Sequence, residues 1–195
     1  MEPVTLTTRR LVLRPFAAGD VEAVYQACQD PEIPRWTAVP SPYTRETAAD
    51  FIGRICPDGW REDTLYNFGV FTVAEDALVG SIGLVRLQQL APPQRQAELG
   101  YWTAADQRGR GYTKEAGREV CRWAFESLGV ERIEWYAEAG NEGSRAVALG
   151  IGFVQEGTLR SRLVHEGTRR DCWVGSLLPS DWQLPSATPY LPAPK

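Results

Sequence analysis

The hexapeptide Arg108-Gly-Arg-Gly-Tyr-Thr113 constrains the fold of this chain more than any other stretch, because it joins a strand-like run to a helix-like run. The strand-like run is Glu98–Trp102, and the helix-like run opens near Lys114. The two glycines leave room for close approach, and a helix start directs free backbone N–H groups and a positive dipole end at the turn. The stretch therefore predicts a phosphate-binding turn within an α/β fold.

The spacing around the turn excludes the two commonest phosphate-binding loops. A mononucleotide P-loop ends in Gly-Lys-Ser/Thr, whereas this chain reads Gly111-Tyr-Thr113. A dinucleotide fingerprint needs a further glycine three positions after its second one, and Lys114 stands there. What remains is a short glycine turn followed by a helix dipole, an arrangement that favours an anion.

The amino-acid composition limits the classes of partner that the protein could bind. The formal net charge of −4 and the pI near 5.2 argue against a nucleic-acid binder, whose affinity comes from a basic face. No apolar run approaches the roughly 20 residues of a membrane span, and the first residues lack a basic stretch followed by an apolar one. We expect a cytoplasmic protein without nucleic-acid or membrane partners.

The cysteines predict neither a metal centre nor a covalent role in catalysis. The four are widely scattered, none forms a Cys-x-x-Cys pair, and His165 is the single histidine. We expect reduced, partly buried thiols and no bound metal.

Hydrophobic periodicity predicts one mixed α/β domain over residues 1–182. The expected strands are 5–16, 68–74, 78–87, 97–102, 132–137, 153–154, 159–164 and 170–178. The expected helices are 20–29, 44–55, 113–128 and 141–149, with Asp20 and Thr44 as N-caps and a turn at 57–59. Residues 30–43, with four prolines, predict an irregular loop on the substrate side. Residues 183–195, rich in proline, predict a flexible or loosely draped tail.

The hexapeptide resembles the Arg/Gln-x-x-Gly-x-Gly/Ala signature of the GCN5-related N-acetyltransferase (GNAT) superfamily, in which the loop holds the pyrophosphate of acetyl-coenzyme A. The chain departs from this signature at Thr113, where the family has Gly or Ala. Four further stretches support the resemblance, and all stand in the family's order. Two precede the hexapeptide, at residues 6–15 and 98–102, and two come after it, at residues 141–144 and 150–157. Together they resemble the branch of ribosomal-protein-alanine N-acetyltransferases (RimJ/RimL-like), over about residues 5–182.

The resemblance implies a GNAT fold, a twisted, mostly antiparallel mixed sheet that is flanked by helices. The sheet would be splayed between its fourth and fifth strands, here 97–102 and 132–137. Acetyl-CoA would be the co-substrate, with backbone groups near Trp102 and Thr103 pairing with pantetheine as a false strand. Asn141 and Ser144 would flank the thioester, and Asn141 would also cap its helix. The pyrophosphate would lie against Arg108, Gly109, Arg110, Gly111, Tyr112 and Thr113.

Acyl transfer from a thioester needs a neutral amine and a proton for the departing thiolate. Glu98, near the entry of its strand, is the first candidate for the base, acting through a water relay. An edge carboxylate paired with Arg86 is the slightly favoured alternative. The proposed base of the ribosomal-protein enzymes does not carry over, because its position here is Leu163. Ser144 is the candidate acid, since it would donate from the first turn of a helix.

The ribosomal-protein branch favours a protein N-terminal α-amine as acceptor, acetylated directly in a ternary complex. A polyamine, an aminoglycoside or another small amine is the alternative, as is a non-catalytic acyl-CoA-binding module. Acidic residues converging at the mouth of the site would favour a polyamine, and a groove for extended backbone would favour a peptide. Family members often form homodimers, and no residue pattern here fixes the oligomeric state. Three tryptophans could line the acceptor pocket or belong to the core, namely Trp36, Trp60 and Trp135.

Overall fold

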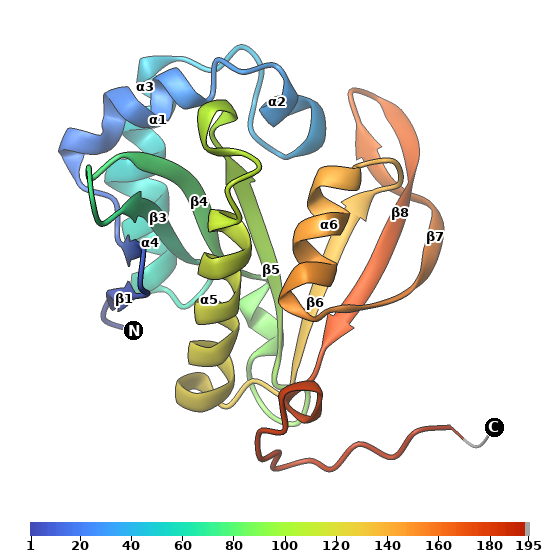
Figure 1. The fold of residues 1–195 in the computed structure, drawn as a ribbon. Coiled ribbons are helices and arrows are strands. Elements are labelled where there is room, and N and C mark those ends of the chain that lie inside the picture. The colour runs from blue at the N-terminus through green and yellow to red at the C-terminus, as the bar shows by residue number, and fades with distance from the viewer. Residues whose placement is uncertain (194–195) are drawn as a thin grey trace.

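The computed structural model describes residues 1–193, which fold around one eight-stranded sheet in the order β1-β2-β3-β4-β5-β6-β8-β7 (Figure 1). The strands are β1 (Leu6–Thr7), β2 (Leu11–Arg14), β3 (Tyr66–Thr72), β4 (Leu78–Val85), β5 (Gln96–Thr103), β6 (Arg132–Glu138), β7 (Val154–His165) and β8 (Thr168–Leu177). Neighbouring strands pair antiparallel except β5 and β6, which pair in parallel. The mixed, mostly antiparallel sheet expected from the sequence is therefore confirmed.

The helices cover both faces and one end of the sheet (Figure 1). They are α1 (Val21–Ala27), α2 (Glu32–Trp36), α3 (Arg45–Asp50), α4 (Cys56–Arg61), α5 (Tyr112–Leu128) and α6 (Glu142–Ile151). In Figure 1, α5 and α6 lie in front of the sheet, α4 lies behind β3 and β4, and α1 to α3 cross the upper end. None of the helices within residues 1–193 combines the length and the apolar character that crossing a bilayer would take.

The first expected strand, 5–16, is in fact a short hairpin of β1 and β2. The turn forms because the Thr8 hydroxyl accepts the backbone N–H of Leu11 at 3.0 Å and donates to the Glu115 carboxylate of α5 at 2.6 Å. Leu11 and Leu13 still face one way, as predicted, and both are fully buried.

The predicted helix at 44–55 begins where expected but does not end there. The Thr44 hydroxyl accepts the N–H of Thr47, which confirms it as the N-cap. After α3 the chain forms a π-helical turn over Phe51–Ile55 and continues into α4, so the expected turn at 57–59 is wrong. Pro57 lies where the π-helical turn passes into α4, at the start of that helix, which is the part of a helix that tolerates proline best.

The segment 30–43 contains the short helix α2, so the expectation of a wholly irregular loop is wrong. Asp20 is the N-cap residue of α1, as predicted, but its side chain forms no capping hydrogen bond, and the helix does not reach residue 29. The Asp20 carboxylate instead accepts the N–H of Ala17 at 2.7 Å and pairs with Arg14, while α1 ends at Ala27.

The split in the sheet lies between β5 and β6. The two strands pair over Gln96–Glu98 and Arg132–Glu134. Within residues 1–193 they form no further pairing with each other, although β5 runs on to Thr103 and β6 to Glu138. β4 pairs with the other edge of β5 as far as Thr103, so that end of β5 is held in place while its β6-facing edge stays open.

The described part of the tail runs away from the body of the domain at its lower end (Figure 1). Leu184 packs against the core, and the carboxylate of Glu131 accepts the backbone N–H of Ala187 at 2.8 Å. The tail thus begins draped over the domain, and Tyr190 and Leu191 beyond it are exposed. Residues 194 and 195 lie outside the described residues.

Candidate active site

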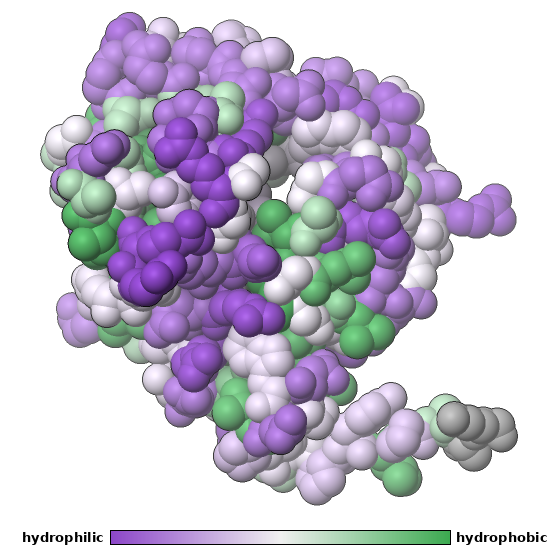
Figure 2. Space-filling view, viewed as in Figure 1, coloured by the Kyte–Doolittle hydropathy of each residue, from purple (hydrophilic) through white to green (hydrophobic). Residues whose placement is uncertain are grey.

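Two cavities of about 730 Å³ each lie on opposite sides of the split. The helix-side cavity lies among the N-terminal ends of α5 and α6, the end of β5 and α2, and Figure 2 shows this face hollowed there. The strand-side cavity is lined by residues of β3, β4, β5, β6 and the end of β7, and by α2, α3 and the segment between these two helices. The two cavities share six lining residues, Trp36, Thr37, Tyr101, Trp102, Asn141 and Ser144.

The glycine turn forms the floor of the helix-side cavity. Gly109 and Gly111 adopt positive φ angles of 75° and 74°, a conformation that glycine takes without strain. A Cβ atom on Gly109 would meet no heavy atom within 4 Å, so the turn is open. Gly111 is the N-cap of the 17-residue α5, and no side chain caps that end. The first-turn N–H groups and the positive end of the dipole are therefore available to an anion.

The cations around this turn differ in part from those expected. Arg108 lines the cavity, but its guanidinium pairs with Asp30 and donates to the Thr103 carbonyl at 3.2 Å. Arg110 is exposed and does not line the cavity, so its predicted contact with the pyrophosphate finds no support in the geometry. Lys114, in the first turn of α5, does line it. The sequence signal for this role is that Lys114 stands in the first turn of a helix that follows a glycine turn.

Thr113, the position that departs from the family signature, is buried. Its hydroxyl lies 2.6 Å from the hydroxyl of Thr103. The side chain therefore joins the start of α5 to the open end of β5, which accounts for a residue larger than Gly or Ala at this position.

Gln107 is a further residue that sequence reasoning missed. It is only 8% exposed and lines the helix-side cavity. Its Nε2 donates to Asp106 at 2.8 Å, while its Oε1 finds no donor among residues 1–193. A buried acceptor without a donor, an open glycine turn and two cations fit a ligand that carries both amides and phosphates, as coenzyme A does.

Ser144 lies where the two cavities meet. Its hydroxyl accepts the indole N–H of Trp135 at 2.9 Å and lies 3.1 Å from the Tyr101 hydroxyl. Tyr101 donates to the Ser144 carbonyl at 2.9 Å, and Asn141 accepts the Ser144 N–H at 3.0 Å. Asn141 is thus confirmed as the N-cap of α6. Burial raises the pKa of Tyr101. This residue was not singled out from the sequence, although strand alternation places its side chain on the face of β5 opposite to that of Gly100 and Trp102.

Glu98 lines the strand-side cavity and forms the ion pair that was its alternative interpretation. Arg86 Nε lies 2.8 Å from Glu98 Oε2, so the two groups form an ion pair. Oε2 nevertheless accepts no hydrogen bond from any group within residues 1–193. Burial raises the pKa of Glu98, Arg86 opposes the rise, and Glu134 adds to it. The carboxylate is therefore buried at the wall of a cavity, paired and harder to ionise than usual.

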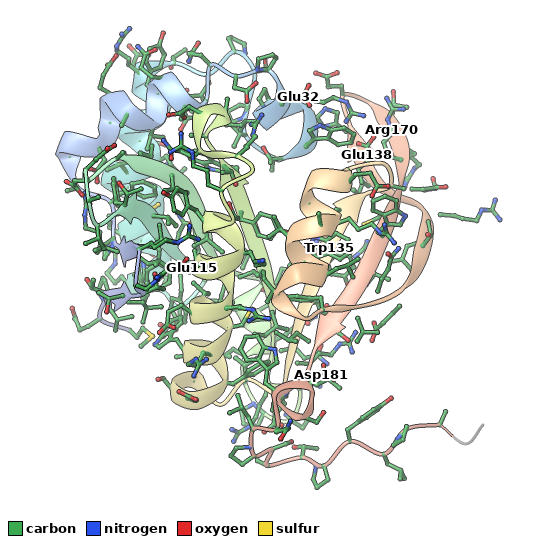
Figure 3. The ribbon with its side chains drawn as sticks, in the orientation of Figure 1. Glu32, Glu115, Trp135, Glu138, Arg170 and Asp181 are labelled. Carbon is green, nitrogen blue, oxygen red and sulfur yellow. The ribbon has the colours of Figure 1, made fainter. Side chains whose placement is uncertain are left out.

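The three tryptophans have different locations. Trp36 lines both cavities, and Trp135 lines the strand-side cavity while remaining 1% exposed (Figure 3). Trp60 lines neither cavity; it stacks on Tyr66 at 4.7 Å between ring centroids, and its indole donates to the Asn67 carbonyl. Its assignment to the acceptor pocket is therefore wrong, and it belongs to the aromatic core.

All four cysteines are free and buried, as expected. Burial raises the pKa of Cys28 and Cys56 to about 12, so neither thiol ionises readily near neutral pH. Within residues 1–193, His, Cys, Asp and Glu side chains form no group of three or more suited to a metal ion.

Comparison with known proteins agrees with this architecture. The model of the Acetyltransferase (GNAT) domain matches residues 10–154. The putative ribosomal N-acetyltransferase YdaF of Bacillus subtilis (strain 168) is 40% identical over 101 residues, which are 52% of this chain and 55% of that protein. The uncharacterized N-acetyltransferase YoaA of the same organism is 29% identical over 89% of this chain and 96% of its own. A solved structure of a putative ribosomal-protein-serine acetyltransferase from Vibrio cholerae is 28% identical, covers 90% of this chain and 98% of its own, and has a TM-score of 0.76.

The fold and the site thus define an acetyl-CoA-dependent N-acetyltransferase, and the chain belongs to the GNAT acetyltransferase family. The similarity to proteins named as ribosomal-protein acetyltransferases agrees with the RimJ/RimL-like resemblance found in the sequence.

Proposed function

We propose that this enzyme acetylates the α-amine of a protein N-terminus by direct transfer in a ternary complex. Acetyl-CoA occupies the helix-side cavity, and the amine enters from the strand-side cavity. The observation that carries the proposal is that the two cavities meet at Tyr101, Asn141 and Ser144. A thioester brought to this point from one side is open to attack from the other, so no covalent enzyme intermediate is required.

In this proposal the donor extends from the glycine turn to the split in the sheet. The pyrophosphate lies against Gly109, Gly111 and the first turn of α5, with Arg108 and Lys114 supplying positive charge. The pantetheine arm pairs with the β5 edge at Trp102 and Thr103, which β6 leaves open. Tyr112 and Thr113 contribute backbone N–H groups at the helix start.

Ser144 is the proposed acid for the departing thiolate. Its oxygen already accepts from Trp135, and because Tyr101 donates to the Ser144 carbonyl, the serine proton points to Tyr101 Oη at 3.1 Å and turns from there to the thiolate. The dipole of α6 favours negative charge at the same place. Glu98 remains the proposed base through a water relay, and its ion pair with Arg86 makes it a weak one.

The charges of the strand-side cavity favour a peptide amine over a polyamine. Its lining carboxylates are Asp50, Glu98 and Glu138, and each pairs with an arginine, namely Arg54, Arg86 and Arg35. A polycation would thus find no unpaired lining carboxylate within residues 1–193. A weak base also suits an α-amine, since deprotonation at pH 7 costs about 1–1.4 kcal/mol for a pKa of about 7.7–8.0 but roughly 4.6 kcal/mol for a lysine-like amine. Similarity to proteins named as ribosomal-protein acetyltransferases supports the same choice.

The test has two stages. Isothermal titration with coenzyme A comes first, and absence of binding at millimolar ligand would remove the donor site. Turnover of acetyl-CoA is then measured with a serine-initiated peptide, with the same peptide blocked at its N-terminus but carrying an internal lysine, and with spermidine and kanamycin. We expect turnover with the free N-terminus and little with the others. Preference for spermidine or kanamycin would replace the peptide acceptor by a small amine.

A further inference from the structure

The short helix α2 lies over the point where the cavities meet. Glu32 and Ile33 line the helix-side cavity, Arg35 lines the strand-side cavity, and Trp36 lines both. The position of α2 therefore affects the shape of both cavities at once. The ion pairs that hold α2 belong to segments far away in the sequence.

At its start, α2 is held by Asp30. One carboxylate oxygen of Asp30 accepts the backbone N–H of Glu32 at 3.1 Å, so it supports the first turn of the helix. The other oxygen pairs with the guanidinium of Arg108 in the glycine turn. The Asp30 side chain is only 17% exposed. A single carboxylate thus joins α2 to the turn that is proposed to bind the pyrophosphate.

At its other end, α2 is held by Arg35. Two nitrogens of its guanidinium donate to the Glu138 carboxylate of β6, at 2.8 and 3.1 Å. Figure 3 shows Glu138 beside Arg170 of β8, whose Nε lies 4.0 Å from the same carboxylate. Trp36 is stacked under Arg35, with the guanidinium carbon 4.0 Å from the ring centroid. The second attachment therefore fixes α2 to the wall of the strand-side cavity.

We infer that Asp30 is a positioning residue that holds α2 over the site by engaging Arg108, and that it thereby competes with the CoA pyrophosphate for this arginine. The inference rests on the donor site of the proposed function. A carboxylate in contact with Arg108 neutralises much of its charge and repels a nearby phosphate. The enzyme consequently binds its donor less tightly than the turn alone would allow, in exchange for an ordered α2.

The inference predicts opposite effects on two properties when the Asp30 charge is removed. Asp30→Asn keeps an oxygen that can accept from Glu32 but loses the negative charge. We expect its Kd for coenzyme A, measured by titration in low salt, to fall by about three- to tenfold. The gain shrinks as NaCl is added, because salt screens the attraction between the phosphates and Arg108, whose side chain is 40% exposed. Hydrogen exchange of the 32–37 amides becomes faster in the same variant.

Two further variants separate this role from a merely structural one. Glu138→Gln weakens the other attachment of α2 but leaves the Asp30 charge beside Arg108, so the 32–37 amides exchange faster without the tighter coenzyme A binding that is expected of Asp30→Asn. Glu22→Gln removes an exposed ion pair with Arg45, at 2.9 Å and away from both cavities, and changes neither property. If Asp30→Asn does not fold, Asp30→Ser also supplies a side-chain oxygen that can accept the Glu32 N–H, without the charge.

The outcomes distinguish this inference from the proposed function. Wild-type protein that fails to bind coenzyme A removes the donor site and the inference with it. Wild-type protein that binds coenzyme A, with an Asp30→Asn variant that binds it equally or more weakly, overturns the inference alone. If the 32–37 amides of Asp30→Asn exchange as slowly as those of the wild type, the inference is also overturned and the proposed function is not affected.

Discussion

Trp135 donates its indole N–H to the hydroxyl oxygen of Ser144 across 2.9 Å, from the floor of the split to the first turn of α6. Tyr101 approaches the same serine from β5 and donates to its carbonyl. Three elements that come together only in the fold thus orient one hydroxyl. Because the Tyr101 proton goes to the carbonyl, the serine hydroxyl donates its own proton to Tyr101 Oη, 3.1 Å away, at the place where both cavities meet.

Ser144→Ala is expected to lower kcat by roughly 100-fold, the lower end of what a positioned acid contributes. A thiolate leaves more readily than an alkoxide, because thiols have a pKa of about 8.5, so the loss is not larger. The Kd for coenzyme A changes little, since the hydroxyl acts on the departing group. Steady-state kinetics and titration give the two values, and Ser127→Ala, on the exposed side of α5, is the matched control. Undiminished turnover in Ser144→Ala would remove this residue from the mechanism.

Glu98 gives the protein a pH dependence of stability with a defined sign. Its pKa is raised in the folded state, mainly by burial. A carboxyl group of this kind contributes stability below its unfolded pKa and loses that contribution as the pH rises through the folded pKa. The stability of the wild type relative to Glu98→Gln should therefore decrease as the pH rises above about 4, the ordinary pKa of a glutamate, as measured by urea unfolding.

Arg86→Gln provides an internal control for this effect. Arg86 opposes the raised pKa of Glu98, so its removal raises that pKa further. The loss of stability with rising pH should then be steeper than in the wild type. A pH profile of Arg86→Gln that is flatter than that of the wild type would contradict the electrostatic account.

Local patterns in the sequence were sufficient for the elements that surround the site. The glycine turn, the long helix after it and the strands on either side of the split lie where periodicity and caps predicted them. The errors arose where a distant side chain decides the backbone. Thr8 turns the first strand into a hairpin by bonding to Glu115, more than a hundred positions away.

The site residues also divide into those that a local sequence pattern could locate and those that it could not. The motif located Asn141, Ser144 and the glycine turn, because their positions follow from the local chain. Tyr101 could be placed on a strand, but its contact with Ser144 spans 43 positions and leaves no local signal. Trp60 shows the converse, since an aromatic residue in a core and one in a pocket have the same sequence pattern.

The contact between Thr113 and Thr103 allows a test of whether the threonine that departs from the family signature stabilises the fold. Their hydroxyls are 2.6 Å apart and join α5 to β5. Thr113→Val keeps the shape but leaves the partner hydroxyl without its bond, which should lower the free energy of unfolding by about 1–2 kcal/mol. The double variant with Thr103→Val should lose less than the sum of the two single variants, by about 1 kcal/mol in a urea-unfolding cycle. Strict additivity would show that the contact contributes nothing.

Gly80 of β4 determines where the open end of β5 lies. A Cβ atom there would stand 2.1 Å from the Trp102 carbonyl oxygen and 3.0 Å from the Thr103 Cα, and both are backbone atoms that cannot yield by side-chain rotation. Gly80→Ala must therefore push away the part of β5 that is proposed to pair with pantetheine. We expect the free energy of unfolding to fall by about 1–3 kcal/mol and the affinity for coenzyme A to fall with it.

Gly53→Ala is the matched control for Gly80→Ala, because a Cβ atom at Gly53 meets no heavy atom within 4 Å. Gly53 lies in the π-helical turn, where alanine should raise stability by about 0.4–1 kcal/mol and leave coenzyme A binding unchanged. Comparing the two variants separates the effect of an added methyl group from the effect of moving β5. A folded Gly80→Ala variant with wild-type affinity would show that the end of β5 does not hold the donor, which would leave the glycine turn as the only supported contact.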